Sequence, residues 1–117
     1  MVKVVRDNGI EMTRGDSLRL KVSMTVGGAP YIPETGDVIR FALKREKMDG
    51  MRTRFVDDEP LVLKNIPTDT MMLELDPEDT KPYEFGDYVY DIQITRADGF
   101  VSTFIADARL TLCREVD

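Results

Sequence analysis

Carboxylates form the first groups of side chains whose types and spacing could support chemistry. One cluster is the run Asp57-Asp58-Glu59, and a second consists of Asp76, Glu78 and Asp79. Carboxylate oxygens bind calcium, but both clusters lack the alternating acids, central glycine and closing glutamate of a calcium loop. Paired carboxylates also hydrolyse glycosides, yet no pair stands out by its spacing. We therefore predict no metal ion and no cofactor, and we interpret the first cluster as a solvated acidic loop.

Nucleophilic catalysis lacks the residues that it usually needs. The sequence contains no histidine, so serine and threonine have no imidazole base, and the one cysteine, Cys113, has no intramolecular partner for a disulfide. Gly27-Gly28 is not followed by the lysine and helix of a phosphate-binding loop. We therefore expect a protein that is not an enzyme.

The charge balance argues against two classes of partner. The 117 residues include 16 Lys and Arg against 22 Asp and Glu, which gives a net charge of -6. Binding to nucleic acid phosphates or to an anionic membrane needs clustered positive charge. No stretch approaches the roughly 18 apolar residues of a membrane span, and the first residues do not resemble a signal peptide. We expect no nucleic acid partner and no membrane partner.

Four side chains are predicted to make protein contacts. Tyr31 and Tyr83 lie in loops flanked by prolines, where an aromatic side chain is suited to a contact surface. Met48 and Met51 lie in the polar region 45–60, where local burial is difficult. That region is predicted to be a long hairpin loop or a mobile excursion. The absence of tryptophan weakens the alternative that tyrosines stack on a sugar.

The elements that position these side chains are predicted to be strands. Apolar residues alternate with polar ones, which is typical of half-buried strands, and turn residues separate the runs. About seven strands are expected, including a short one that ends near Thr13. The others cover residues 17–25, 37–44, 61–64, 71–75, 87–95 and 100–114. The short apolar run Val2-Lys3-Val4-Val5 is expected to pair within the chain or to add to the sheet of a neighbour.

Three local signals refine this prediction. Asp76 and Pro77 suit the N-cap and the first position of a helical turn near residues 77–81, which would carry the chain from one sheet to another. Asp98-Gly99 predicts a hairpin in which both residues favour a positive φ. Ala106-Asp107-Ala108 interrupts the alternation and predicts a bulge. The whole chain, residues 1–117, is predicted to be one all-β domain, an antiparallel sandwich.

The order of these motifs resembles a known family. Residues 10–18, 36–44, 73–80 and 85–93, followed by Asp98-Gly99, resemble the N-terminal domain of lactococcal-type phage upper baseplate proteins and their short prophage relatives. The resemblance extends from about Ile10 to Leu112. It implies an immunoglobulin-like sandwich that serves as a virion building block. In those proteins a helical stalk and a receptor-linking part follow, whereas this sequence ends at Asp117, so we expect a docking or accessory role.

Two functional hypotheses follow. The first is a non-enzymatic structural protein of a phage or prophage tail or baseplate, made in the bacterial cytoplasm. It would assemble with other phage structural proteins and with copies of itself, through sheet edges and the four contact residues. The alternative is a β-sandwich module that binds a ligand such as a cell-surface glycan. It predicts a monomer with a saturable ligand.

Overall fold

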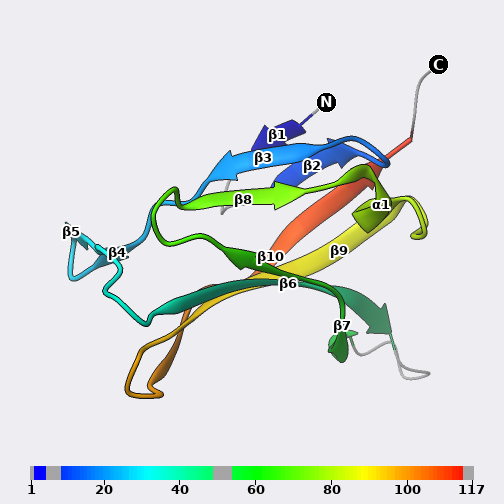
Figure 1. Ribbon diagram of the computed structural model, residues 1–117. Coiled ribbons are helices and arrows are strands. Elements are labelled where there is room, and N and C mark those ends of the chain that lie inside the picture. The colour runs from blue at the N-terminus through cyan, green and yellow to red at the C-terminus, as the bar shows by residue number, and fades with distance from the viewer. Residues whose placement is uncertain (1, 5–8, 49–53, 115–117) are drawn as a thin grey trace.

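The part of the chain that the structure describes forms ten β-strands and one helical turn, and alternating apolar side chains account for the longer strands. The computed structural model describes residues 2–4, 9–48 and 54–114 (Figure 1). The elements, in chain order, are β1 (Val2–Val4), β2 (Ile10–Thr13), β3 (Leu18–Lys21), β4 (Thr25–Val26), β5 (Ala29–Pro30), β6 (Val38–Met48), β7 (Arg54–Ile66), β8 (Met72–Leu75), α1 (Pro77–Thr80), β9 (Gly86–Thr95) and β10 (Val101–Cys113).

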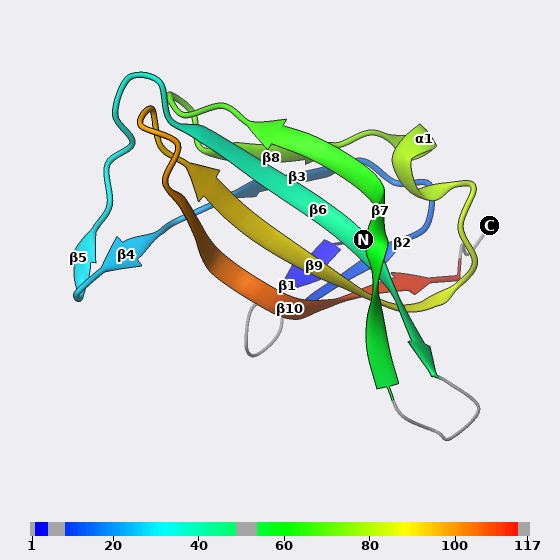
Figure 2. The ribbon, with the colours of Figure 1, turned by 90° about the horizontal axis from the view of Figure 1, so that it is seen from below.

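The strands form a large sheet and a small one that packs over it, so the predicted all-β sandwich is confirmed. The large sheet has the order β1-β2-β10-β9-β6-β7, and the small sheet consists of β3 and β8. A separate β4–β5 hairpin projects from one side (Figure 2). The count exceeds the expected seven because β1, β4 and β5 are additional short strands. β1 pairs with β2 of the same chain, as one of the two alternatives for residues 2–5 predicted.

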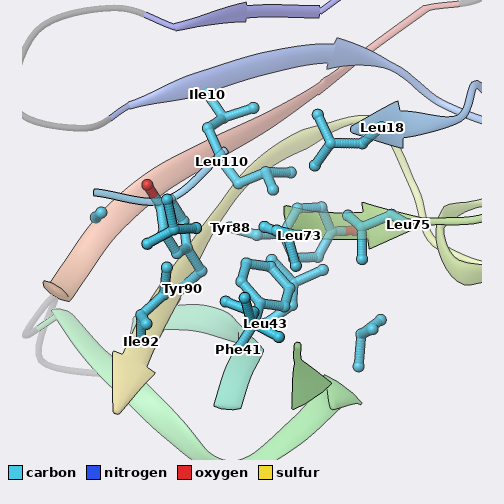
Figure 3. Close-up of a cluster of buried hydrophobic side chains, with 14 of the residues drawn as sticks. Ile10, Leu18, Phe41, Leu43, Leu73, Leu75, Tyr88, Tyr90, Ile92 and Leu110 are labelled. Carbon is cyan, nitrogen blue, oxygen red and sulfur yellow. The ribbon is translucent and has the colours of Figure 1, made fainter. Parts of the chain in front are cut away.

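The core lies between the two sheets. Leu18 of β3 and Leu73 and Leu75 of β8 face side chains of β6 and β9, among them Phe41 and Tyr90 (Figure 3). The rings of Phe41 and Tyr90 have centroids 5.3 Å apart. Removing these apolar side chains from water is the main force that holds the layers together.

One strand pair differs from the antiparallel prediction. β2 and β10 run parallel, with Ile10 opposite Leu110 and Met12 opposite Leu112. Nearly the whole domain separates these two strands along the chain, and a parallel pair needs such a long connection. The large sheet is therefore mixed.

The predicted strand over residues 17–25 is divided. Only Leu18–Lys21 pairs with β8, while Thr25–Val26 belongs to the β4–β5 hairpin. β8 cannot extend further towards its N-terminus as a regular strand, because Met71 takes a left-handed φ of 55° and donates its N–H to Pro67. The carbonyl of Met71 still accepts the N–H of Val22 at 2.7 Å.

The prediction of a loop over residues 45–60 is wrong for most of that range. β6 continues to Met48 and β7 begins at Arg54, so the acidic run 57–59 lies in a strand. The register shifts twice, between Leu43 and Lys44 and between Lys44 and Glu46. These shifts accommodate Pro60 and the charged residues within a paired hairpin.

The helical turn is confirmed and carries the chain from β8 in the small sheet to β9 in the large one. Asp76 precedes α1 and donates its N–H to the carboxylate of Asp79 at 2.7 Å. Asp79 also pairs with Lys64 of β7 at 3.0 Å, and this hydrogen bond raises the pKa of Lys64. Thr80 is fully buried, and its hydroxyl accepts the N–H of Gly15 at 2.9 Å. Across the described ranges, no helix is long and apolar enough to cross a bilayer.

The hairpin and the bulge are confirmed at β9 and β10, but the turn differs in detail. Only Gly99 has a positive φ, whereas the Asp98 carboxylate accepts the N–H of Phe100 at 2.9 Å. The pairing of β10 with β9 is irregular between Thr103 and Ala108. The longer turn leaves Phe100 outside the ladder.

We predict that Thr80→Val destabilises the fold. The substitution keeps the shape of the side chain but leaves the N–H of Gly15 without its acceptor, at a cost of about 1–3 kcal/mol. Urea unfolding should show a lower midpoint with an unchanged slope. Thr80→Ser, which keeps the hydroxyl, should lose less stability, and Thr68→Val in an exposed loop should lose almost none. Equal midpoints for Thr80→Val and the wild type would contradict this role.

Candidate interaction surface

Exposed apolar side chains gather at one end of the sandwich. Within the described ranges six large hydrophobic residues are substantially exposed, and four of them come from two neighbouring loops and the strands that follow them. These four, which we call the apolar end, are Ile32 (80%), Val38 (42%), Phe100 (62%) and Val101 (54%). Val38 and Val101 both pair with Thr95, so they lie on one rung of the large sheet. The end lies away from α1 (Figures 1 and 2).

A polar cluster formed by Tyr31, Asp37 and Arg96 joins the two loops that carry the apolar end. The hydroxyl of Tyr31 donates to the carboxylate of Asp37 at 2.6 Å, and the N–H of Glu34 donates to the same oxygen at 2.9 Å. The guanidinium of Arg96 lies over the Tyr31 ring, 5.1 Å from its centroid, and the Phe104 ring lies 5.8 Å away. These contacts join the loop before β6 to the β9–β10 hairpin.

The two loops also approach each other through their backbones. Gly36 has a φ of 93°, and a Cβ atom there would lie 2.8 Å from the Cβ of Ala97. Only glycine therefore allows this contact without a shift of the chain. The apolar side chains stand on loops that are fixed relative to each other.

Hydrogen bonding within this cluster shifts two pKa values in opposite directions. The hydrogen bond from Tyr31, followed by the N–H of Glu34, holds the pKa of Asp37 below its ordinary value. The same bond raises the pKa of Tyr31. Asp37 is therefore charged, and together with the Tyr31 ring it holds the Arg96 cation in place.

Of the four predicted contact residues, the two whose side chains the structure describes lie apart. Tyr31 lies at the apolar end and is half-buried, whereas Tyr83 lies near α1, where its hydroxyl donates to the Leu61 carbonyl at 3.0 Å. Met48 is the last residue of β6, and its side chain lies outside the description. Met51 lies outside the described residues altogether.

Sequence reasoning missed the four residues of the apolar end. The available signal was their position beside turn residues: Ile32 stands between Pro30 and Pro33, and Phe100 follows Gly99 directly. Large apolar side chains next to turns are hard to bury, because turns lie at the surface.

The long edge of the large sheet is a poorer candidate for pairing. Lys44 pairs with Pro60 and Glu46 with Val56, so residues 57–59 lie opposite Arg45 alone. An irregular strand with acids and a proline is typical of edges that are protected from pairing. Further along β7, Tyr83 occupies the carbonyl of Leu61. The apolar end is therefore the stronger candidate surface.

Carboxylates elsewhere serve structural contacts. Asp79 bonds with Lys64, and Asp91 pairs with Lys44 at 3.2 Å on the outer face of the large sheet. The described part of the chain contains no group of three or more acidic or cysteine side chains placed to hold a metal ion.

We predict that Tyr31→Phe raises the pKa of Asp37 towards its ordinary value of 3.8. In the wild type this pKa is lowered on folding, so the stabilisation is fully present above pH 3.8 and is lost as the pH falls through the lowered pKa. The variant should therefore lose less stability than the wild type as the pH falls. A carboxyl carbon NMR titration measures the pKa, and thermal melts between about pH 2 and 5 measure the stability. Tyr83→Phe, which removes a hydroxyl far from Asp37, should leave this pKa unchanged. An equal pKa of Asp37 in Tyr31→Phe and in the wild type would contradict the assignment of this shift to the Tyr31 hydrogen bond.

Comparison with known proteins does not assign the chain to a family. No protein-family model matches it, and no curated protein or solved structure shows significant similarity. The resemblance to upper baseplate domains stays a prediction from the order of the motifs. The function must therefore be argued from the chemistry of the surface.

Proposed function

We propose that the protein is a non-enzymatic structural component of a phage or prophage tail or baseplate, and that it acts by protein–protein assembly through the apolar end. The observation that carries the proposal is the cluster of Ile32, Val38, Phe100 and Val101, exposed together at one end. Clustered exposed apolar side chains are characteristic of protein interfaces. The order of sequence motifs supplies the phage context.

The support beneath the cluster favours a binding surface. The Tyr31–Asp37 hydrogen bond and the Arg96 cation fix the loops before a partner arrives. A fixed surface loses little conformational entropy on binding, so more of the contact energy appears as affinity. Glu34 and Asp98 are exposed at the rim. The partner surface should therefore have an apolar centre and a basic rim.

The shifted pKa values in the described residues have structural causes. Burial raises the pKa of Tyr90 to about 12 and also raises that of Tyr88. The remaining shifts belong to the Tyr31–Asp37 and Lys64–Asp79 hydrogen bonds. Perturbed groups in an active site usually face a shared cleft, whereas these groups lie in different parts of the fold, and the shift of Tyr90, which lines a cavity, follows from burial.

Copies of the chain are proposed to lie side by side in the particle, as tail components do when they form closed rings. In such a ring the apolar end of each copy contacts another phage structural protein. A surface of four side chains is small for a stable dimer, so contacts with more than one neighbour would hold each copy.

We predict that the protein co-purifies with phage particles from a strain that carries its gene. After prophage induction, density-gradient particles should contain a fixed number of copies, measured by quantitative mass spectrometry. Phe100→Ser combined with Val101→Ser should reduce this number at least about tenfold, because each buried apolar side chain contributes about 1.5–3 kcal/mol.

The control is Leu63→Ser, which removes an equally exposed apolar side chain from β7 on the outer face of the large sheet. This variant should enter particles at the level of the wild type. Particles that lack the protein, or equal incorporation of the double variant and wild type, would overturn the proposal.

A further inference from the structure

We propose that the free edge of β3 accepts an extended segment of a partner protein, with apolar residues at alternate positions and an acidic residue between them. The site consists of β3, residues 22 and 23, and an apolar cavity of about 240 Å³ beside them. It uses none of the residues of the apolar end, so it does not rest on the proposed function.

Hydrogen bonding in the small sheet shows which way the backbone of β3 points. Val22 donates its N–H to Met71, and the register places Leu20 opposite Leu73. In an antiparallel ladder the residues that bond with one neighbour alternate with those that point to the other side. The N–H and carbonyl groups of Arg19, Lys21 and Ser23 therefore point away from β8. Among the described strands, β3 has no neighbour on that side.

The cavity lies where the small sheet leaves the large one uncovered. Two strands form one layer and six form the other, so part of the large sheet's inner face lacks a partner. Both layers and the β10 bulge contribute to the walls, and Figure 3 shows Ile10, Leu73 and Tyr90 in the adjoining core. The main apolar wall residues are Ile10, Leu20, Val22, Leu73, Tyr90 and Ile105. Side chains of an added strand would fill this space at every second residue.

Charge selects an acidic occupant. Lys21 lies at the mouth of the cavity and, within the described parts of the chain, forms no ion pair. Arg19, two residues earlier on the same face of β3, pairs with Glu74 of β8 at 3.0 Å. β8 has the sequence Met-Leu-Glu-Leu, with apolar residues on either side of the acid. The neighbour that β3 already has therefore shows the chemistry expected of a second one.

The strand-forming sequence is also longer than its present partner. Apolar and polar residues alternate over residues 17–25, yet only Leu18–Lys21 pairs with β8. Val22 and Met24 are buried, and Ser23 between them is exposed, as in a continuing strand. Val22 bonds with Met71 and Met24 with Tyr31, so an added segment would pair with the outward-pointing backbone groups of Lys21 and Ser23.

The test is an amide NMR titration of the full chain with the peptide acetyl-Thr-Val-Glu-Val-Glu-Val-Thr-amide. We expect saturable shifts centred on the amides of Lys21 and Ser23. Replacing both glutamates by lysine should weaken binding about fivefold, because like charges would replace a favourable cross-strand charge pair with Lys21. N-methylation of the alternate peptide amides that face β3 should abolish binding. N-methylation of the other amides, which face away from β3, should leave binding nearly unchanged.

Protein variants complete the test. Lys21→Glu should reverse the preference, so that the lysine peptide binds more tightly than the glutamate peptide. Arg40→Glu, which changes an exposed cation on β6, should leave the preference unchanged, and so should Phe100→Ser at the apolar end. The absence of saturable shifts would overturn strand addition. Equal binding of the two peptides that are N-methylated on alternate sets of amides would also overturn it. Shifts at the cavity with dodecanoate but not with the peptide would also overturn it and indicate a fatty-acid site.

Discussion

The fold depends on the two connections that carry the chain between its layers, and one buried hydroxyl links these two connections. The β2–β3 turn takes the chain from the large sheet to the small one, and α1 brings it back. The hydroxyl of Thr80 in α1, whose side chain is fully buried, accepts the N–H of Gly15 in the β2–β3 turn. Arg14 adds a hydrogen bond to the Tyr83 carbonyl at 3.3 Å and lies over the Phe85 ring. The two layers are thus closed at this end by polar contacts, which are directional and fix the relative position of the sheets.

The opposite end, where we propose that a partner binds, is built differently. Its loops are fixed by Tyr31, Asp37 and Arg96, which hold one loop against the other but do not cover the side chains above them. Ile32 and Phe100 consequently remain in water at a hydrophobic cost. A fold that only needed stability would be expected to place polar residues at such turns. A partner that covers these side chains, as we propose, would remove this cost.

The sequence predicted those features that depend on neighbouring residues. Asp76 and Pro77 predict the helical turn α1, and the alternation over residues 87–95 predicts the strand β9. The features that it did not predict depend on residues far apart in the chain. The parallel pairing of Ile10 with Leu110 and the contact of Arg96 with Tyr31 leave no local pattern. The acidic run 57–59 was assigned to a loop because its polarity resembles one, whereas pairing with β6 makes it a strand. Tertiary contacts outweigh such weak local preferences.

The two proposed surfaces have one feature in common. Each contains groups that the rest of the described chain leaves exposed or unpaired. Residues 17–25 have the alternation of a longer strand than β8 can pair with, and the large sheet extends beyond the small one that covers it. The apolar end offers side chains to a partner, whereas the β3 edge offers backbone groups and a cavity. Occupation of one surface uses no residue of the other, so two neighbours can bind at once. In the proposed assembly each contact would raise the effective concentration for the other, and two weak contacts would then hold a subunit that neither would hold alone.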